Sequence, residues 1–169
     1  LVTVFMNGVS YSSAVAVGVL PTSWIVAGVG DFNGDNKADI LLRNVNGTFA
    51  VWHMDGVTVL PSSGIVAALP TSWVIPTVAD FDGDGKADLL MRNSNGDLVT
   101  CFLNGIAIAS CQFVGNIPNE WSISAVGDVN GDKKADIAWR STSGQVVGSR
   151  PARDLVPVAG IGDGMNLLA

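Results

Sequence analysis

Short apolar runs separated by polar turns follow one another along the chain, and no stretch keeps the 3.6-residue period of an amphipathic helix. In the clearest stretch the runs cover residues 73–78, 87–92, 98–103 and 106–114. The last two flank Asn104-Gly105, a dipeptide that favours a tight hairpin turn. This pattern predicts a sheet of four short antiparallel strands, with helix nearly absent. Similar runs occupy residues 1–6, 9–19, 24–29, 38–43, 48–54 and 57–66.

The same order of runs and turns recurs along the chain, so the sequence is a tandem repeat. An acidic loop begins at Asp31, Asp80 and Asp128, at intervals of 49 and 48 residues. A period of about 40–50 residues with several short strands is typical of β-propeller blades or solenoids. Other residues recur in the same register: Trp24, Trp73 and Trp121 at the start of each repeat, Arg43, Arg92 and Arg140 after the second run, and Gly47, Gly96 and Gly144 at a turn.

We therefore predict an all-β chain of β-propeller blades, each a four-stranded antiparallel sheet with a period of about 48–49 residues, and about 3.5 blades in the 169 residues. The predicted units are a half blade over residues 1–22, two full blades over 23–71 and 72–119, and a degenerate terminal blade over 120–169. The half blade supplies only the third and fourth strands. In the terminal blade, residues 158–163 mimic the start of a further repeat but lack the acidic residues that should follow.

Each acidic loop carries an oxygen-bearing side chain at loop positions 1, 3, 5 and 9. Ca²⁺ takes about six to eight oxygen ligands at about 2.3–2.6 Å, and alternate residues of a tight turn can supply them. Clustered carboxylates also repel one another unless a cation is present. The alternative is a network of side chain–backbone hydrogen bonds that folds without metal. The candidate ligands are Asp31, Asn33, Asp35 and Asp39; Asp80, Asp82, Asp84 and Asp88; and Asp128, Asn130, Asp132 and Asp136.

The segment from Val29 to Asn44, Val-Gly-Asp-Phe-Asn-Gly-Asp-Asn-Lys-Ala-Asp-Ile-Leu-Leu-Arg-Asn, resembles the FG-GAP/VCBS repeat, and the resemblance covers roughly residues 1–147. That family builds β-propellers, including integrin α-subunit heads and seven-bladed fungal and bacterial lectins. The resemblance implies an extracellular propeller with ion loops between the first two strands of each blade, up to three Ca²⁺ ions, and roles in adhesion or carbohydrate binding. It also implies that the main-chain carbonyls of Lys37, Lys86 and Lys134 complete the three ligand sets.

The three loops differ in charge and in the residue at loop position 6, where the turn favours a positive φ. Glycine adopts this conformation easily and asparagine at little cost, whereas a long side chain is strained. Gly85 and Asn36 suit the position and Lys133 does not. The second loop also has four carboxylates against three in each of the others. We therefore predict that Ca²⁺ affinity decreases in the order second, first, third loop.

Composition limits the functions open to the chain. Hydrophobic residues make up 48% and charged residues 14%, and much of the net charge of −6 lies in the acidic loops. Lys and Arg are not clustered as on a nucleic-acid-binding surface, and no apolar run of about 18 residues predicts a membrane span. Weak calcium loops suit the roughly millimolar calcium outside cells, which favours a secreted or surface-exposed protein. The start at Leu1 is compatible with a mature product or with a piece of a longer chain.

Nearly all acidic residues belong to the loops, so the chain lacks an evident pair of carboxylates for glycoside hydrolysis and we expect no enzyme. Trp24, Trp73 and Trp121 are predicted to pack between neighbouring blades. Trp52 and Trp139 are not repeated, so they either pack in the core or bind a ligand by stacking on a sugar ring. The three repeated arginines are expected to bind carbonyl or carboxylate groups of a neighbouring loop.

Two cysteines, Cys101 and Cys111, flank the Asn104-Gly105 turn. In a two-residue type I′ hairpin Cys101 opposes residue 108 and Cys111 opposes Leu98, so the two cysteines point to opposite faces. The favoured interpretation is a pair of buried free thiols. A disulfide would need a bulge or a longer loop.

Single-chain propellers close with typically about four to eight blades, so about 3.5 blades leave open faces. The chain is then part of a longer chain, or two copies close a seven-bladed ring, or copies associate head-to-tail into a filament. Residues 1–6 offer an unpaired strand edge to a partner. The first functional hypothesis is a calcium-stabilised, non-catalytic module that binds a glycan or an extracellular protein. The alternative is a structural subunit that self-assembles into an oligomeric propeller or filament through its incomplete blades.

Overall fold

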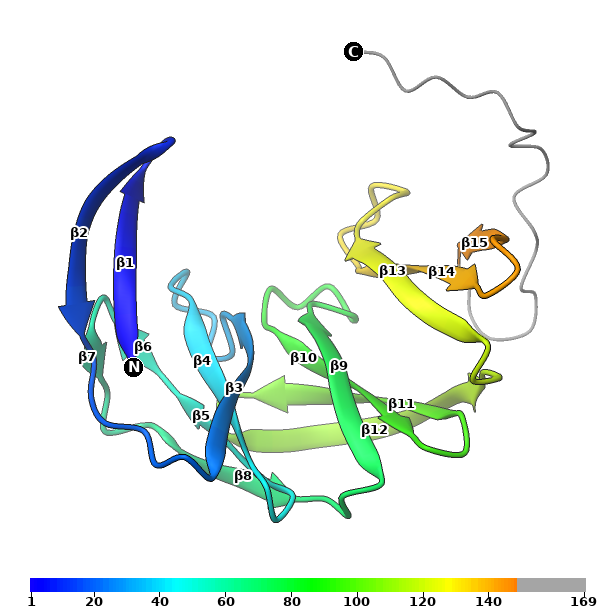
Figure 1. Cartoon of the computed structure of the whole chain (residues 1–169), viewed down its shortest axis with the longest axis horizontal. Helices are drawn as coiled ribbons and strands as arrows, with labels where there is room; N and C mark the ends of the chain where they lie inside the picture. Colours follow the sequence, from blue (N-terminus) through cyan, green and yellow to red (C-terminus); the bar gives the residue numbers. More distant parts are fainter. Residues whose placement is uncertain (149–169) are drawn as a thin grey trace.

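The computed structural model describes residues 1–148, which contain strands and connecting loops but no helix (Figure 1). The all-β prediction is therefore confirmed. Residues 149–169, the last part of the terminal blade predicted over residues 120–169, lie outside the described residues. The described residues accordingly include no helical segment that could span a membrane.

The strands form successive antiparallel sheets that correspond to the predicted blades. The first blade has the order β3-β4-β5-β8, the second β9-β10-β11-β12, and the third β13-β14-β15, while β1 and β2 pair separately as the half blade. The strand bounds are β1 Val2–Asn7, β2 Ser10–Ala16, β3 Trp24–Gly30, β4 Asp39–Asn44, β5 Thr48–Trp52, β8 Gly64–Ala68, β9 Trp73–Ala79, β10 Asp88–Asn93, β11 Asp97–Asn104, β12 Ala107–Asn116, β13 Trp121–Gly127, β14 Asp136–Ser141 and β15 Val146–Gly148.

One predicted strand is divided. The apolar run over residues 57–66 yields β7 (Thr58–Val59), which pairs with β6 (Met54–Asp55), and then β8. Pro61 lies between β7 and β8, where it cannot donate a ladder hydrogen bond, and the chain turns at residues 60–63. The first blade consequently carries a small extra hairpin beyond β5.

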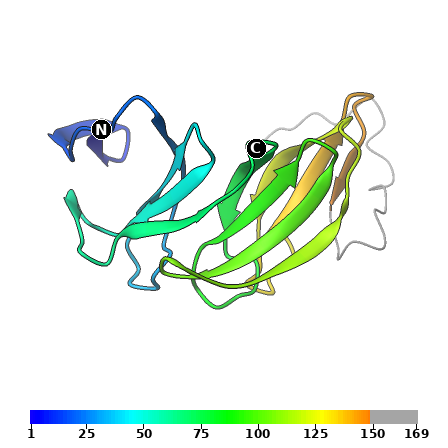
Figure 2. The ribbon, with the colours of Figure 1, turned by 90° about the horizontal axis from the view of Figure 1, so that it is seen from below.

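The sheets follow one another around an arc (Figures 1 and 2). The first strands of the three blades, β3, β9 and β13, are neighbours along this arc. Among the described residues β1 pairs only with β2, so the other edge of β1 is unpaired, as predicted. The arrangement is that of an incomplete propeller.

The hydrophobic core lies between the blades. Successive residues of a strand point to opposite faces of its sheet, so each central strand serves two interfaces. Leu89 of β10 packs with Leu41 of the first blade, whereas its neighbour Leu90 packs with Ile137 and Trp139 of the third. Each fully buried leucine contributes about 1.5–3 kcal/mol through removal of its side chain from water. Stacking of blades is therefore the main source of stability.

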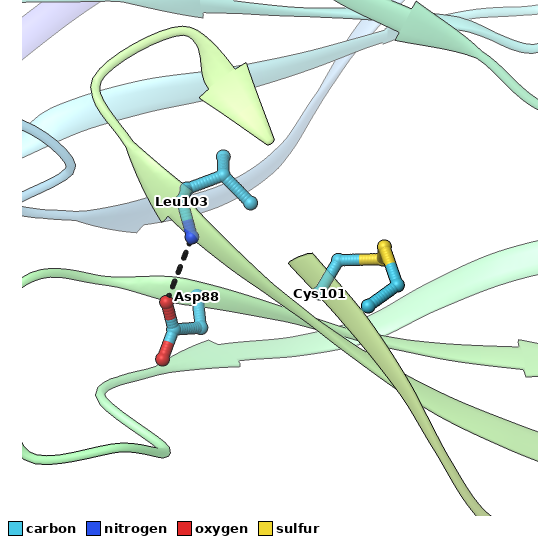
Figure 3. Close-up of a disulfide and its surroundings, with 4 residues drawn as sticks. Asp88, Cys101 and Leu103 are labelled. Carbon is cyan, nitrogen blue, oxygen red and sulfur yellow. Dashed lines mark hydrogen bonds between the residues drawn. A yellow bond between two sulfur atoms is a disulfide. The ribbon is translucent and has the colours of Figure 1, made fainter. Parts of the chain in front are cut away.

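The prediction of two free thiols is wrong, because Cys101 and Cys111 form a disulfide between β11 and β12 (Figure 3). The turn consists of Gly105 and Ile106, since Asn104 pairs with Ala107, and of these two residues only Gly105 has a positive φ. A bulge next to Phe102 then adds one residue to β12. That residue shifts the parity of the pairing, so the two cysteines lie opposite each other on one face.

Reducing this disulfide should lower the free energy of unfolding by about 2–3 kcal/mol, because a crosslink over a short loop restricts the unfolded chain. The measurement is urea denaturation of the chain with and without reductant. A Cys101→Ala, Cys111→Ser double variant is the control and should not respond to reductant. An equal response of that variant would show that the reductant acts elsewhere.

Candidate metal site

The three acidic loops connect the first and second strands of the blades: β3 to β4, β9 to β10, and β13 to β14. In the second loop one oxygen of Asp80 accepts the Gly83 N–H at 2.6 Å and the other accepts the Gly85 N–H at 2.9 Å. Asp82 accepts the Asp84 N–H at 3.1 Å, and Asp84 accepts the Lys86 N–H at 2.8 Å. The same bonds from loop positions 4, 5, 6 and 7 recur in the other two loops. The sequence thus folds each loop around its acidic side chains.

In the first and second loops the aspartate at loop position 9 has a structural role as well, because it connects the loop to a residue at or just beyond the end of the third strand. Asp88 accepts the Phe81 N–H at 2.9 Å. It also accepts the Leu103 N–H at 3.0 Å (Figure 3). Asp39 accepts the corresponding bonds from Phe32 and Met54. Both carboxylates are buried, with 0% of Asp39 and 1% of Asp88 exposed. Sequence reasoning treated these residues only as ligands and missed this structural role.

In the second loop Asp80, Asp82 and Asp88 come together, with ligand oxygens within 4.8 Å of one another. Burial raises the pKa of Asp88 to about 6, an effect opposed by the two N–H bonds and reinforced by the charges of Asp82 and Asp80. A cation between the three carboxylates would offset both the burial and the repulsion. Asp84 instead pairs with Lys86 at 2.8 Å, and the hydrogen bond from Lys86 lowers the pKa of Asp84. An all-oxygen set of this kind fits a hard cation such as Ca²⁺.

In the first and third loops asparagine replaces the aspartate at position 3, so these loops bring together fewer charges. Asn33 and Asn130 still accept the N–H of the residue two positions later. The backbone N–H groups that bind Asp128, that of Lys133 foremost, lower the pKa of this carboxyl group. The carbonyls of Lys37, Lys86 and Lys134 remain predicted ligands.

Loop position 6 has a positive φ in all three loops, as predicted: 64° at Asn36, 85° at Gly85 and 70° at Lys133. Position 4 is glycine with positive φ in each loop, which explains the recurrence of Gly34, Gly83 and Gly131. Lys133 is thus the residue least suited to its backbone conformation.

Replacing Lys133 with glycine should therefore raise the free energy of unfolding by about 0.5–1 kcal/mol, because glycine adopts this φ without a Cβ clash. Gly85→Ala at the matched position of the second loop should have the opposite sign. Thermal unfolding in EDTA measures both changes without a contribution from bound metal. A loss of stability in Lys133→Gly would mean that its side chain matters more than its backbone.

Two of the three repeated arginines, Arg43 and Arg92, bind main-chain carbonyls of the next blade, which confirms the predicted role for these two. Arg43 Nη2 donates to the Trp73 carbonyl at 2.6 Å, and Arg92 Nη1 donates to the Trp121 carbonyl at 2.7 Å. Arg92 Nη2 also donates to the carbonyls of Ile117 and Pro118 at 2.9 Å. Trp73 and Trp121 therefore contribute to the contacts between blades through their backbone as well as their rings.

Of the two interpretations of Trp139, the structure supports core packing and not ligand binding. Only 1% of Trp139 is exposed, it packs in the core between the second and third blades, and Arg92 lies over its ring at 5.5 Å. Trp52 is half-buried and lines an apolar pocket of about 280 Å³ on the first blade, together with Trp24, Leu42 and Ile65. Of the two candidates only Trp52 presents an accessible ring.

Two four-stranded sheets and one with three described strands follow an arc, each with an acidic loop between its first two strands, and this arrangement defines the class of β-propeller repeat proteins. The profile of the FG-GAP-like repeat matches residues 31–91, and that of the FG-GAP repeat matches residues 121–149. Together the matches cover just over half of the chain, which belongs to the FG-GAP repeat family. No curated protein matches the chain. FG-GAP repeats are typically extracellular and non-catalytic and are often found in adhesion proteins.

Proposed function

We propose that this chain is a calcium-binding, non-catalytic module of an extracellular protein, and that its blades present a surface for adhesion to a glycan or another protein. The observation that supports calcium binding is the convergence of Asp80, Asp82 and Asp88 within 4.8 Å. The family supports the extracellular setting and adhesion. We expect up to three Ca²⁺ ions, bound in the order second, first, third loop.

Calcium would act mainly on stability. A ligand that binds only the folded state stabilises it by about 2.7 kcal/mol when present at about 100 times its Kd. In the second loop the ion would be held by the three converging carboxylates, while Asp88 connects it to β11 through the Leu103 N–H. The acidic loops also concentrate like charge, so the folded state should be less stable when calcium is withdrawn.

The test is calorimetric titration with Ca²⁺ and Mg²⁺, combined with melting temperatures in calcium and in EDTA. Asp82→Asn removes one carboxylate but leaves the acceptor for the Asp84 N–H, so the second loop should bind calcium no better than the first. Glu120→Gln removes the same charge outside the loops and should bind as the parent chain does. An unchanged melting temperature in EDTA, with no heat of calcium binding, would contradict the proposal.

The adhesion ligand is tested separately. Binding to a glycan array that is lost in Trp52→Ala and kept in Tyr11→Ala, an exposed aromatic residue of the half blade, would support a glycan. Binding that ignores both changes would place the ligand site elsewhere on the blades.

A further inference from the structure

Three contacts join neighbouring blades, and each occurs at both described blade–blade interfaces. The first is the arginine bond to the opening tryptophan of the next blade. The second connects the loops: the N–H of Ala87 donates to the Asp31 carbonyl at 2.6 Å, and that of Ala135 donates to the Asp80 carbonyl at 2.7 Å. The third places the Lys86 side chain against Gly34 and that of Lys134 against Gly83.

At the two ends of the described stack the same groups lack their counterparts. On the third blade Arg140 is exposed, and within residues 1–148 the Asp128 carbonyl receives no such bond and Gly131 has no neighbour within 4 Å of a Cβ position. On the first blade no arginine of residues 1–148 reaches the Trp24 carbonyl, and the Ala38 N–H has no bond to a preceding loop. The two sets are complementary: Arg140 with Trp24, Asp128 with Ala38, and Gly131 with Lys37.

Apolar residues at the two ends of the described stack are also more exposed than their counterparts between blades. Val26 of β3 is 43% exposed, whereas Ile75, its counterpart in the second blade, is 9% exposed because the first blade covers it. Val129 is 82% exposed, whereas its counterpart Phe32 is 0% exposed at the interface with the second blade. Both ends thus expose positions that blade packing buries elsewhere in the chain.

We infer that a second copy of this chain docks head-to-tail, with the third blade of one copy on the first blade of the other. In that arrangement Arg140 donates to the Trp24 carbonyl, Ala38 donates to the Asp128 carbonyl, and Val26 and Val129 become buried. The occupant is a second copy because the chain already forms this interface twice within itself, and each end carries one half of it. The contact is heterologous, so repetition yields a ring or a filament.

The half blade leaves room for this docking. Its two strands correspond to the third and fourth strands of a blade, while β13 and β14 are first and second strands. The incoming β13 and β14 therefore take the places before β3 that the half blade does not supply. Since β15 and β1 are both third strands, β15, which has three residues, yields its place on β14 to β1.

Docking of this kind and sugar stacking on Trp52 exclude each other. The pocket beside Trp52 lies on the same face of the first blade as Trp24. Its counterpart Cys101 is buried in the interface between the first and second blades. The inference stands independently of calcium binding, although Ca²⁺ in the loop of the third blade would reduce the repulsion between two chains of net charge −6.

The experiment is sedimentation velocity of the full chain over a wide range of concentrations, in calcium and in EDTA. The chain should self-associate, and Val26→Glu or Val129→Glu should weaken association by at least about tenfold, since each places a charge in an apolar contact. Val45→Glu is the matched control, because Val45 is exposed and its counterparts Ser94 and Thr142 are exposed as well. It should associate as the parent chain does.

Mixing distinguishes a head-to-tail contact from other association. Val26→Glu keeps an intact third blade and Val129→Glu keeps an intact first blade, so an equimolar mixture should form a dimer that neither variant forms alone. Arg140→Ala, which removes no bond present in residues 1–148, should weaken association without lowering the melting temperature. A parent chain that stays monomeric, for example because residues 149–169 cover the third blade, would overturn the inference. Association that Val26→Glu and Val129→Glu leave unchanged would also overturn it.

Discussion

Replacing Asp88 with alanine should lower the free energy of unfolding by about 3–4 kcal/mol in EDTA, because two N–H groups lose a charged acceptor and one of them is buried. The donors are Phe81 at the start of the loop and Leu103 near the end of β11. The variant also no longer has to bury a charged group, and this burial is what raises the pKa of Asp88 to about 6. The loss of stability should therefore be smaller than the summed free energies of the two hydrogen bonds. Urea denaturation at neutral pH measures the change.

Asp136→Ala provides the matched control for this change. Asp136 stands at the same loop position but is only partly buried, and within the described residues it accepts one bond, from Val129 at 3.1 Å. Its loss should cost about 1 kcal/mol. Equal losses for Asp88→Ala and Asp136→Ala would mean that the bond to the third strand contributes nothing. In calcium the Asp88→Ala deficit should grow, because that variant also loses a candidate ligand.

Arg92→Ala is expected to have the second large effect, a loss of about 3 kcal/mol, because one side chain serves three carbonyls and an aromatic ring. Its guanidinium binds the carbonyls of Ile117, Pro118 and Trp121 and lies over Trp139. The substitution therefore removes these hydrogen bonds between the second and the third blade, while the apolar contacts between the blades remain. The readout is denaturant unfolding at a protein concentration where the chain is monomeric.

Two arginines at matched positions calibrate that result. Arg43 makes one bond to the next blade, to the Trp73 carbonyl, so Arg43→Ala should cost less than Arg92→Ala. Arg140→Ala should leave the stability of the monomer unchanged. A ranking in which Arg140→Ala is as harmful as Arg92→Ala would show that the arginines act within their own blades.

The repeat architecture could be predicted from the sequence because the same motif occurs three times in it. The spacing of Asp31, Asp80 and Asp128 defined the blades, and most strand bounds lie within two residues of the expected apolar runs. The β-bulge beside Phe102 could not be predicted, because one extra residue changes the facing of Cys111 without any mark in the hydrophobic pattern. The disulfide depended on that single residue.

The candidate site was predictable in its composition but not in its geometry. Alternate oxygen side chains identified the loops, whereas the pairing of Asp84 with Lys86 and the bonds of Asp88 to Phe81 and Leu103 depend on tertiary packing. The contacts between loops were also missed. Their signal was the Lys-Ala pair at loop positions 7 and 8, which recurs in all three copies and which single-blade reasoning left unexplained.

The contacts between blades also have a mechanical consequence. Because each blade contacts only its immediate neighbours, the stability of the molecule is a sum of terms for single blades and for the interfaces between adjacent blades. Unfolding of one blade therefore affects distant blades less than adjacent ones. Within residues 1–148 the second blade is bonded to a neighbour on both sides, by Arg43 and by Arg92, while the third blade contacts a described neighbour on one side only. Amide protons of β10 should thus exchange most slowly, and fraying should advance inward from either terminus under heat or force.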